Sequence, residues 1–184
     1  ILDEGRLVPR DASVAANWYR LAAEQGHVPS QARIGRMYAD GDGVPPRSDE
    51  ALRWVRLAAD AGDPAGCNSL ALFYLRGLGT EQSFEKALRW YLEAAELEDA
   101  SAQNMLGSLY LTGHGGIPKS TAEAEKWWRR AAEQGYAAAQ YNLGGMFSRD
   151  LSTALSREEA IAWLTRAAAQ GHAAAGLELA ELKG

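Results

Sequence analysis

From residue 127 to residue 135 the chain reads Trp127-Trp128-Arg129-Arg130-Ala131-Ala132-Glu133-Gln134-Gly135. Versions of this segment occur five times, and each begins with a tryptophan: Trp18, Trp54, Trp90, Trp127 and Trp163. The spacings between these tryptophans are 36, 36, 37 and 36 residues. Chance does not keep five copies of a rare residue in register, so the chain is built from repeats of about 36 residues.

Each repeat predicts two helices. The second helix carries the tryptophan, and its apolar residues follow the spacing of one helical face, as in Ala51, Trp54, Val55, Ala58 and Ala59. The first helix carries an aromatic residue near its end: Tyr38, Tyr74, Tyr110 or Phe147. Three positions before each aromatic lies a small residue: Gly35, Ala71, Gly107 or Gly144. Because glycine costs a helix about 1 kcal/mol relative to alanine, we expect a neighbouring helix to approach closely at this position.

A single helical hairpin cannot bury its own apolar face, whereas stacked hairpins bury it against one another. The predicted fold is therefore all-α: one α/α solenoid of helix-turn-helix repeats over 1–184. Full repeats span about 28–63, 64–99, 100–136 and 137–172, with partial repeats at 1–27 and 173–184. Val8 and Pro9 match Val44 and Pro45 one period later, so we expect the chain to be a fragment cut within a repeat. Trp54, Trp90 and Trp127 should be buried between successive hairpins. The loop within 148–157 has no glycine and departs from the pattern.

The repeat pattern resembles that of the Sel-one-like repeat, a relative of the tetratricopeptide repeat. The residues that carry the resemblance are 140–147, 41–44 and 127–135. The resemblance implies a right-handed superhelix that acts as a scaffold or adaptor for a protein or peptide partner. It also implies a bacterial regulatory or envelope-associated protein, and favours a periplasmic or secreted location over a cytoplasmic one.

Other classes of function find little support in the composition. The formal net charge of −5 argues against nucleic acid as a partner, since phosphate binding needs a clustered basic excess. The run from Lys126 to Arg130 mixes basic and aromatic residues, but Trp127 holds the repeat position, so we interpret its charges as a solvated helix face. No apolar stretch approaches the roughly 20 residues of a membrane span.

No catalytic residue, metal ligand or cofactor site is expected. His27 and His172 share one repeat position and His114 lies in a loop, and none has further ligands at metal-binding spacing. Cys67 stands where Gln31, Gln103 and Gln140 occur in the other repeats, which favours a structural thiol. Two alternatives stay open: an enzyme, for example hydrolase-like, or a small-ligand protein of this fold, and a spacer with no partner.

The candidate binding surface follows from positions that vary while the fold repeats. Relative to each first-helix aromatic, position −4 is always Ile or Leu, whereas positions −6, −2 and +2 differ freely. These positions share a helix face, so we expect a concave groove lined by Arg36, Asn68, Leu72, Arg76, Asn104, Ser108, Tyr141 and Arg149. The same positions hold Ala32, Asp40, Thr112 and Gly145.

Each residue type in this groove suits a different contact. The asparagines would pair with a partner's backbone, the arginines would favour an acidic segment, and Tyr141 and Leu72 would be apolar anchors. The alternative is that these positions are merely exposed to solvent.

Overall fold

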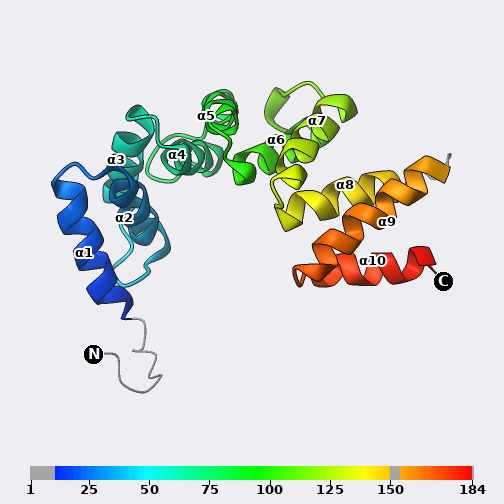
Figure 1. Cartoon of the computed structure of the whole chain (residues 1–184). Helices are drawn as coiled ribbons and strands as arrows, with labels where there is room; N and C mark the ends of the chain where they lie inside the picture. The colour runs from blue at the N-terminus through cyan, green and yellow to red at the C-terminus, as the bar shows by residue number, and fades with distance from the viewer. Residues whose placement is uncertain (1–10, 150–153, 184) are drawn as a thin grey trace, which may run out of the picture. The chain divides into compact units, whose positions relative to one another are not determined.

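The structure, a computed structural model, describes residues 11–149 and 154–183. Within those ranges every regular element is helical and there is no β-strand, which confirms the predicted all-α class (Figure 1). The helices are α1 (Ala12–Glu24), α2 (Val28–Asp40), α3 (Ser48–Asp60), α4 (Pro64–Arg76), α5 (Phe84–Glu96), α6 (Ala100–Thr112), the 3-10 helix η1 (His114–Gly116), α7 (Thr121–Glu133), α8 (Ala137–Arg149), α9 (Ala154–Ala169) and α10 (Ala173–Lys183).

Close packing of the two helices of a hairpin explains the recurring small residue. A Cβ atom added at Gly35 of α2 would lie 2.7 Å from Cγ1 of Val55 on α3. At Gly144 of α8 it would lie 2.8 Å from Cγ of Leu164 on α9. Both separations are shorter than van der Waals contact, so a side chain at either position would displace the facing residue. The prediction of a close helix approach is confirmed.

Turns between repeats place a residue in the left-handed region after the second helix. Gly26, Gly62, Gly135 and Gly171 have φ values of 86°, 77°, 87° and 85°. Glu98 holds the equivalent place in its own repeat with φ 62°, a conformation that non-glycine residues adopt at some cost in energy. Its carboxylate accepts hydrogen bonds from Arg130 at 2.7 Å and from Gln103 at 3.1 Å. The hydrogen bond from Arg130, followed by that from Gln103, holds the pKa of Glu98 below its usual range.

The glutamines shared by the first helices have a structural role that the sequence alone did not reveal. Gln103 Nε2 donates to Ala95 O at 3.0 Å, and Gln140 Nε2 donates to Ala132 O at 3.0 Å. Each bond gives a second donor to a carbonyl near the C-terminal end of the preceding second helix, which also accepts from a backbone N–H of the following turn. Cys67 makes the weaker equivalent, from Sγ to Ala59 O at 3.7 Å. The thiol is buried.

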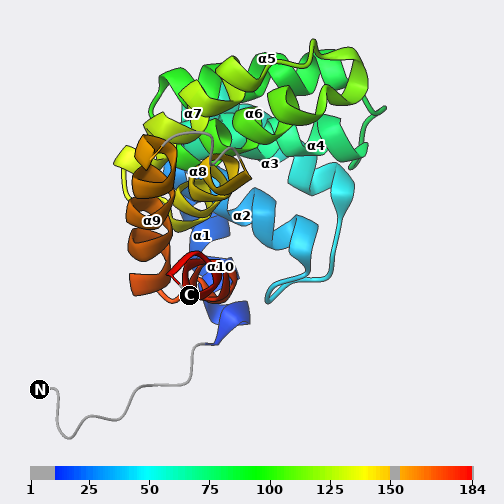
Figure 2. The ribbon, with the colours of Figure 1, turned by 90° about the vertical axis from the view of Figure 1, so that its right-hand side faces the viewer.

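The chain forms two compact units, Ile1–Ser83 and Phe84–Gly184. In the first unit, helices α1, α2 and α3 share an apolar cluster of Ala16, Ala23, Ile34, Met37 and Trp54. In the second unit, helices α7, α8 and α9 share a cluster of Ala124, Trp128, Ala131, Ala132, Ala139, Leu143 and Trp163. There α9 lies alongside α8 and α10 in both views (Figures 1 and 2), and Leu164, Ala167 and Ala175 extend the core toward α10.

The five tryptophans are not equally buried. Trp54 and Trp127 are 4% and 3% exposed, as predicted. The same prediction is wrong for Trp90, which is only half-buried. Trp18 on α1 is 68% exposed.

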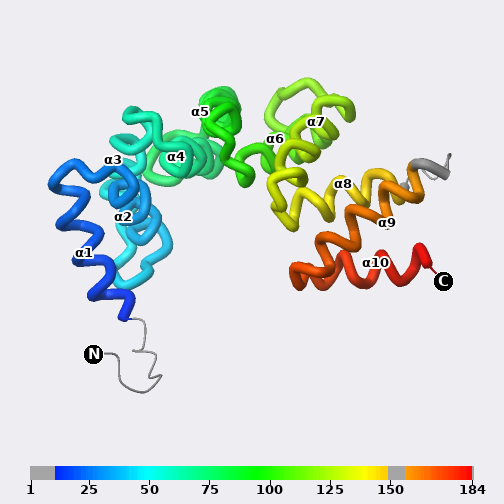
Figure 3. Tube along the Cα trace, in the orientation of Figure 1, coloured from blue at the N-terminus to red at the C-terminus, as the bar shows by residue number. Residues whose placement is uncertain are grey.

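Short connections join the helices in the Cα trace (Figure 3). The loop expected over 148–157 is wrong at both ends, because α8 continues to Arg149 and α9 already begins at Ala154. Residues 150–153 are outside the described residues.

Candidate functional site

The eight predicted groove residues all lie on first helices of the hairpins. Arg36 lies on α2, and Asn68, Leu72 and Arg76 lie on α4 of the first unit. Asn104, Ser108, Tyr141 and Arg149 lie on α6 and α8 of the second unit. Arg36 and Arg76 are exposed and Asn68 and Leu72 half-buried, while the side chain of Arg149 is outside the described atoms. Ala32 was placed on the same face, but it is buried against the core at 3% exposure, so that assignment is wrong.

In the second unit, four of the variable positions line one groove of about 370 Å³. They are Ser108, Thr112, Tyr141 and Gly145, from facing stretches of α6 and α8. Four more residues complete the lining: Leu111, Trp128, Asn142 and Met146. Leu111 lies three residues after Ser108, so helical spacing could have found it. Trp128 could not be found in this way, because its repeat position indicated core.

Trp128 forms the base of the groove, since its side chain belongs to the core cluster and is only 3% exposed. A Cβ atom at Gly107 would lie 2.5 Å from Cδ1 and Nε1 of the indole, so the ring occupies the space that this glycine leaves. The indole Nε1 donates to Asn104 O at 3.1 Å. Trp128 therefore joins the core of the unit to the wall of the groove.

Asn104 does not line the groove and is engaged within the fold. Its Oδ1 accepts a hydrogen bond from Asn142 Nδ2 at 2.9 Å, which links α6 to α8. The amide N–H groups and one lone pair of Oδ1 are then left for a partner, and the side chain is held in place by its bond with Asn142.

The hydroxyl groups of the groove wall are orientated by their own helix. Ser108 Oγ donates to Asn104 O at 3.3 Å, and Thr112 Oγ1 donates to Ser108 O at 2.9 Å. Because each hydroxyl proton points to a backbone carbonyl, the oxygens offer lone pairs to the groove. On the opposite wall the ring of Tyr141 stacks on His172, with centroids 4.5 Å apart and planes 25° apart. The groove thus combines apolar surface with hydrogen-bond acceptors.

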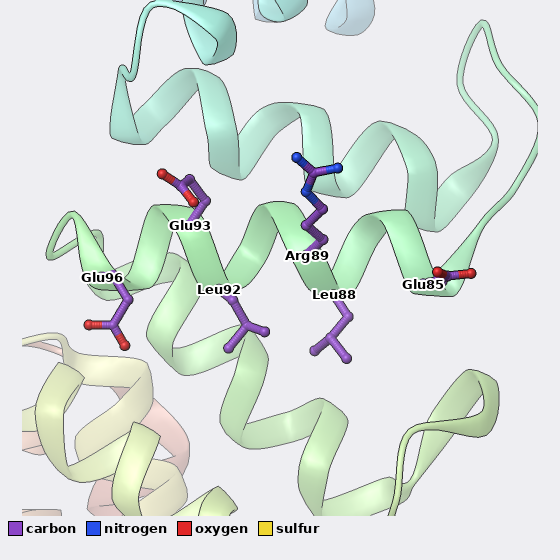
Figure 4. A pocket seen from close by; sticks show the side chains of 6 residues that line it. All are labelled: Glu85, Leu88, Arg89, Leu92, Glu93 and Glu96. Carbon is purple, nitrogen blue, oxygen red and sulfur yellow. The ribbon is translucent and has the colours of Figure 1, made fainter.

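A second surface lies on α5 alone (Figure 4). It consists of Glu85, Leu88, Arg89, Leu92, Glu93 and Glu96. In Figure 4 the two leucines project to one side of the helix, while Arg89 and Glu93 project to the other. A similar stripe on α3 includes Leu52, Arg53 and Leu57. Each of these surfaces has lining residues from one helix only and no opposing wall, so the groove between α6 and α8 is the stronger candidate site.

The histidines and the basic run have local structural contacts. His27 Nδ1 lies 2.8 Å from Ser30 Oγ. His172 Nδ1 accepts from the backbone N–H of Ala175 at 3.3 Å and so caps the start of α10. In the described parts of the chain no three His, Cys, Asp or Glu residues come together as metal ligands would. Arg129 and Arg130 pair with Glu125 and Glu98, each at 2.7 Å.

Comparison with known proteins identifies the repeat. The sequence profile of the Sel1 repeat matches residues 1–27, 28–63, 64–99, 100–136 and 137–172. This chain belongs to the Sel1 repeat family. Proteins built from Sel1 repeats are generally scaffolds for protein interactions, and the fold is typically non-catalytic. A search of curated proteins finds no match.

Solved structures of Sel1 repeat proteins resemble the chain over most of its length. One is a protective antigen present in uropathogenic Escherichia coli strains, with 36% identity and a TM-score of 0.76 over 94% of this chain. Another is a Sel1 repeat protein from Oxalobacter formigenes, with 33% identity and a TM-score of 0.81 over 95% of this chain. The chain spans only 37% and 50% of those two proteins. An immunity protein from Pseudomonas aeruginosa shares the fold at 22% identity, with a TM-score of 0.68 over 92% of this chain and 62% of that one.

Among the described residues of this Sel1 repeat chain, no helix is both long enough and apolar enough to cross a membrane.

Proposed function

We propose that this Sel1 repeat chain is a protein-binding scaffold and that the groove between α6 and α8 holds an extended segment of its partner. The observation that carries the proposal is the convergence of Ser108, Thr112, Tyr141 and Gly145 on one groove. These positions vary between repeats while the packing positions beside them, such as Leu106 and Leu143, stay apolar and fully buried. A rigid frame with variable residues on one face is how repeat proteins form recognition surfaces.

The chemistry of the lining favours a peptide over a substrate. None of the eight lining residues is charged, and none is a His, Cys, Asp, Glu or Lys, the residues that most often transfer protons in active sites. Apolar walls from Leu111, Met146 and Tyr141 suit one or two apolar side chains, and the hydroxyl oxygens suit backbone N–H groups. In the first unit, Arg36, Asn68, Leu72 and Arg76 are proposed as further contacts of the partner.

Filling the groove tests this proposal. We would select binding peptides from a random displayed library and compare their affinities for Ser108→Trp, which fills the groove, and Thr165→Trp, which adds the same side chain to the exposed face of α9. Ser108→Trp should weaken binding by about tenfold or more, and Thr165→Trp should leave it unchanged. Asn104→Ala is a poorer test, because it also removes the hydrogen bond from Asn142.

Affinity is measured by fluorescence anisotropy, and thermal melts confirm that both variants fold. Peptides that bind Ser108→Trp as tightly as the unchanged chain would move the site away from this groove, with the α5 surface as the next candidate.

A further inference from the structure

One carboxylate, which is not itself a lining residue, lies close to Gly145 of the groove wall. Glu178 of α10 accepts a hydrogen bond from the hydroxyl of Ser148 on α8. A Cβ atom at Gly145, one of the lining residues, would lie 3.5 Å from both Oε1 and Oε2 of Glu178. The absence of a side chain at residue 145 therefore leaves both carboxylate oxygens next to the groove wall.

This carboxylate differs from the other half-buried glutamates in the described part of its unit, each of which lies within 4 Å of a basic side chain. Glu96, Glu98, Glu125 and Glu159 each lie within 4 Å of an arginine side chain, at distances of 3.3, 2.7, 2.7 and 3.8 Å. Glu178 is half-buried, and no basic side chain among the described residues pairs with it. A partly desolvated negative charge without a cation is a favourable site for one supplied by a partner.

Like Glu178, the polar groups of the groove favour hydrogen-bond donors on a binding partner. Ser108 and Thr112 direct their hydroxyl protons to their own helix and leave oxygen lone pairs toward the groove. No described lining residue carries a positive charge. Backbone N–H groups and a cationic side chain would find acceptors here, whereas a carboxylate would meet the negative charge of Glu178.

We propose that the groove recognises a segment in which an apolar side chain lies close to an arginine. The apolar side chain occupies the space between Leu111, Tyr141 and Met146, and the guanidinium pairs with the two oxygens of Glu178 across Gly145. Arginine suits this place because its planar group can donate to both oxygens at once. The proposal rests on the proposed peptide-binding function, and it replaces the acidic partner that Arg149 suggested for this groove.

Three sets of end-blocked, fluorescein-labelled peptides test the preference. All contain one leucine in a Gly/Ser background, and the sets carry a single Arg, Gln or Glu at one to four positions from the leucine. Anisotropy titrations at physiological ionic strength should show the best Arg peptide binding about tenfold more tightly than its Glu counterpart. Glu178→Gln keeps an acceptor for Ser148 and should reduce this ratio to below about threefold. Glu181→Gln, an exposed change of equal charge on α10, should keep the full ratio.

The outcomes separate the two proposals. Equal affinity for the Arg, Gln and Glu peptides, combined with loss of binding in Ser108→Trp, would leave the groove as the site and overturn the arginine preference. Tighter binding of the Glu set would also overturn it and would favour the acidic segment. A ratio unchanged in Glu178→Gln would place the recognition of arginine elsewhere. Absence of binding by every set would overturn both proposals.

Discussion

Gly107 and Trp128 show how single residues control the packing of a hairpin. The indole of Trp128 on α7 fills the place where a side chain at residue 107 of α6 would stand. Its Nε1 donates to the carbonyl of Asn104, which lies one turn before Gly107 on α6. The other hairpins achieve the same approach with Gly35 against Val55 and with Gly144 against Leu164. The small residue and its facing partner therefore form a pair, and the size of one limits the size of the other.

The substitution Gly107→Ala tests this pairing. Alanine favours the helix by about 1 kcal/mol, but its Cβ would displace the indole, and overpacking costs about 1–3 kcal/mol. We expect a net loss of about 1 kcal/mol in the free energy of unfolding, together with weaker protection of Trp128, at the base of the groove, from solvent. Gly176→Ala on α10 is the matched control, because nothing lies within 4 Å of the added Cβ, and it should be neutral or stabilising. Urea titration measures both, and a Gly107→Ala variant as stable as the control would contradict the pairing.

At the scale of the element, the second helix carries the main anchor of each repeat. Trp127 of α7 is buried, and its Nε1 has no hydrogen-bond partner within the described residues, so its contribution comes from packing. Arg130 and Lys126 lie over its ring at 4.9 and 5.3 Å from the centroid. Trp18 holds the same repeat position on α1 but is largely exposed. The tryptophan of the repeat should therefore contribute differently to the free energy of unfolding in different helices.

Alanine substitutions at Trp127 and Trp18 test whether the stability effect of this repeat position depends on burial. Trp127→Ala should lower the free energy of unfolding by about 3–5 kcal/mol, because it leaves a large cavity. Trp18→Ala should change it by no more than about 0.5 kcal/mol, as is usual for surface positions. Chemical denaturation followed by circular dichroism measures both values. Equal losses in the two variants would show that burial does not determine the role of this position.

At the scale of the molecule, the second unit contains a complete core and the complete groove. The clusters around Trp128 and Leu164 lie within Phe84–Gly184, and so do all residues that line the groove. In a repeat protein, stability is approximately a sum over hairpins and the interfaces between neighbours. Residues 84–184 therefore hold the core of this unit and every residue that lines the groove, while the further contacts proposed for the partner lie in the first unit.

A fragment of residues 84–184 should fold by itself. We expect it to melt cooperatively by circular dichroism and to bind the selected peptides within about twofold of the affinity of the whole chain. The Ser108→Trp change should abolish that binding in the fragment as it does in the chain. A fragment that is unfolded, or folded and unable to bind, would show that the groove depends on residues before Phe84.

The sequence by itself determined the helical class, the repeat length and the hairpin organisation. These follow from it because burial recurs every period: the tryptophans, the apolar face of the second helix and the small residue before each aromatic all repeat. It also indicated Ser108, Thr112, Tyr141 and Gly145 as one surface, since helical spacing determines which residues of a helix share a face.

Only the tertiary structure decided what depends on neighbours. The position of a residue in its repeat does not reveal whether a helix covers it, which is why Trp90 and Ala32 were assigned to the wrong environments. Helical spacing also does not reveal contacts between helices far apart in the chain, such as Asn142 with Asn104 or Glu178 with Ser148. These contacts determine which polar atoms remain for a partner, because a donor proton used within the fold is no longer free, whereas an oxygen that accepts one hydrogen bond keeps a second lone pair.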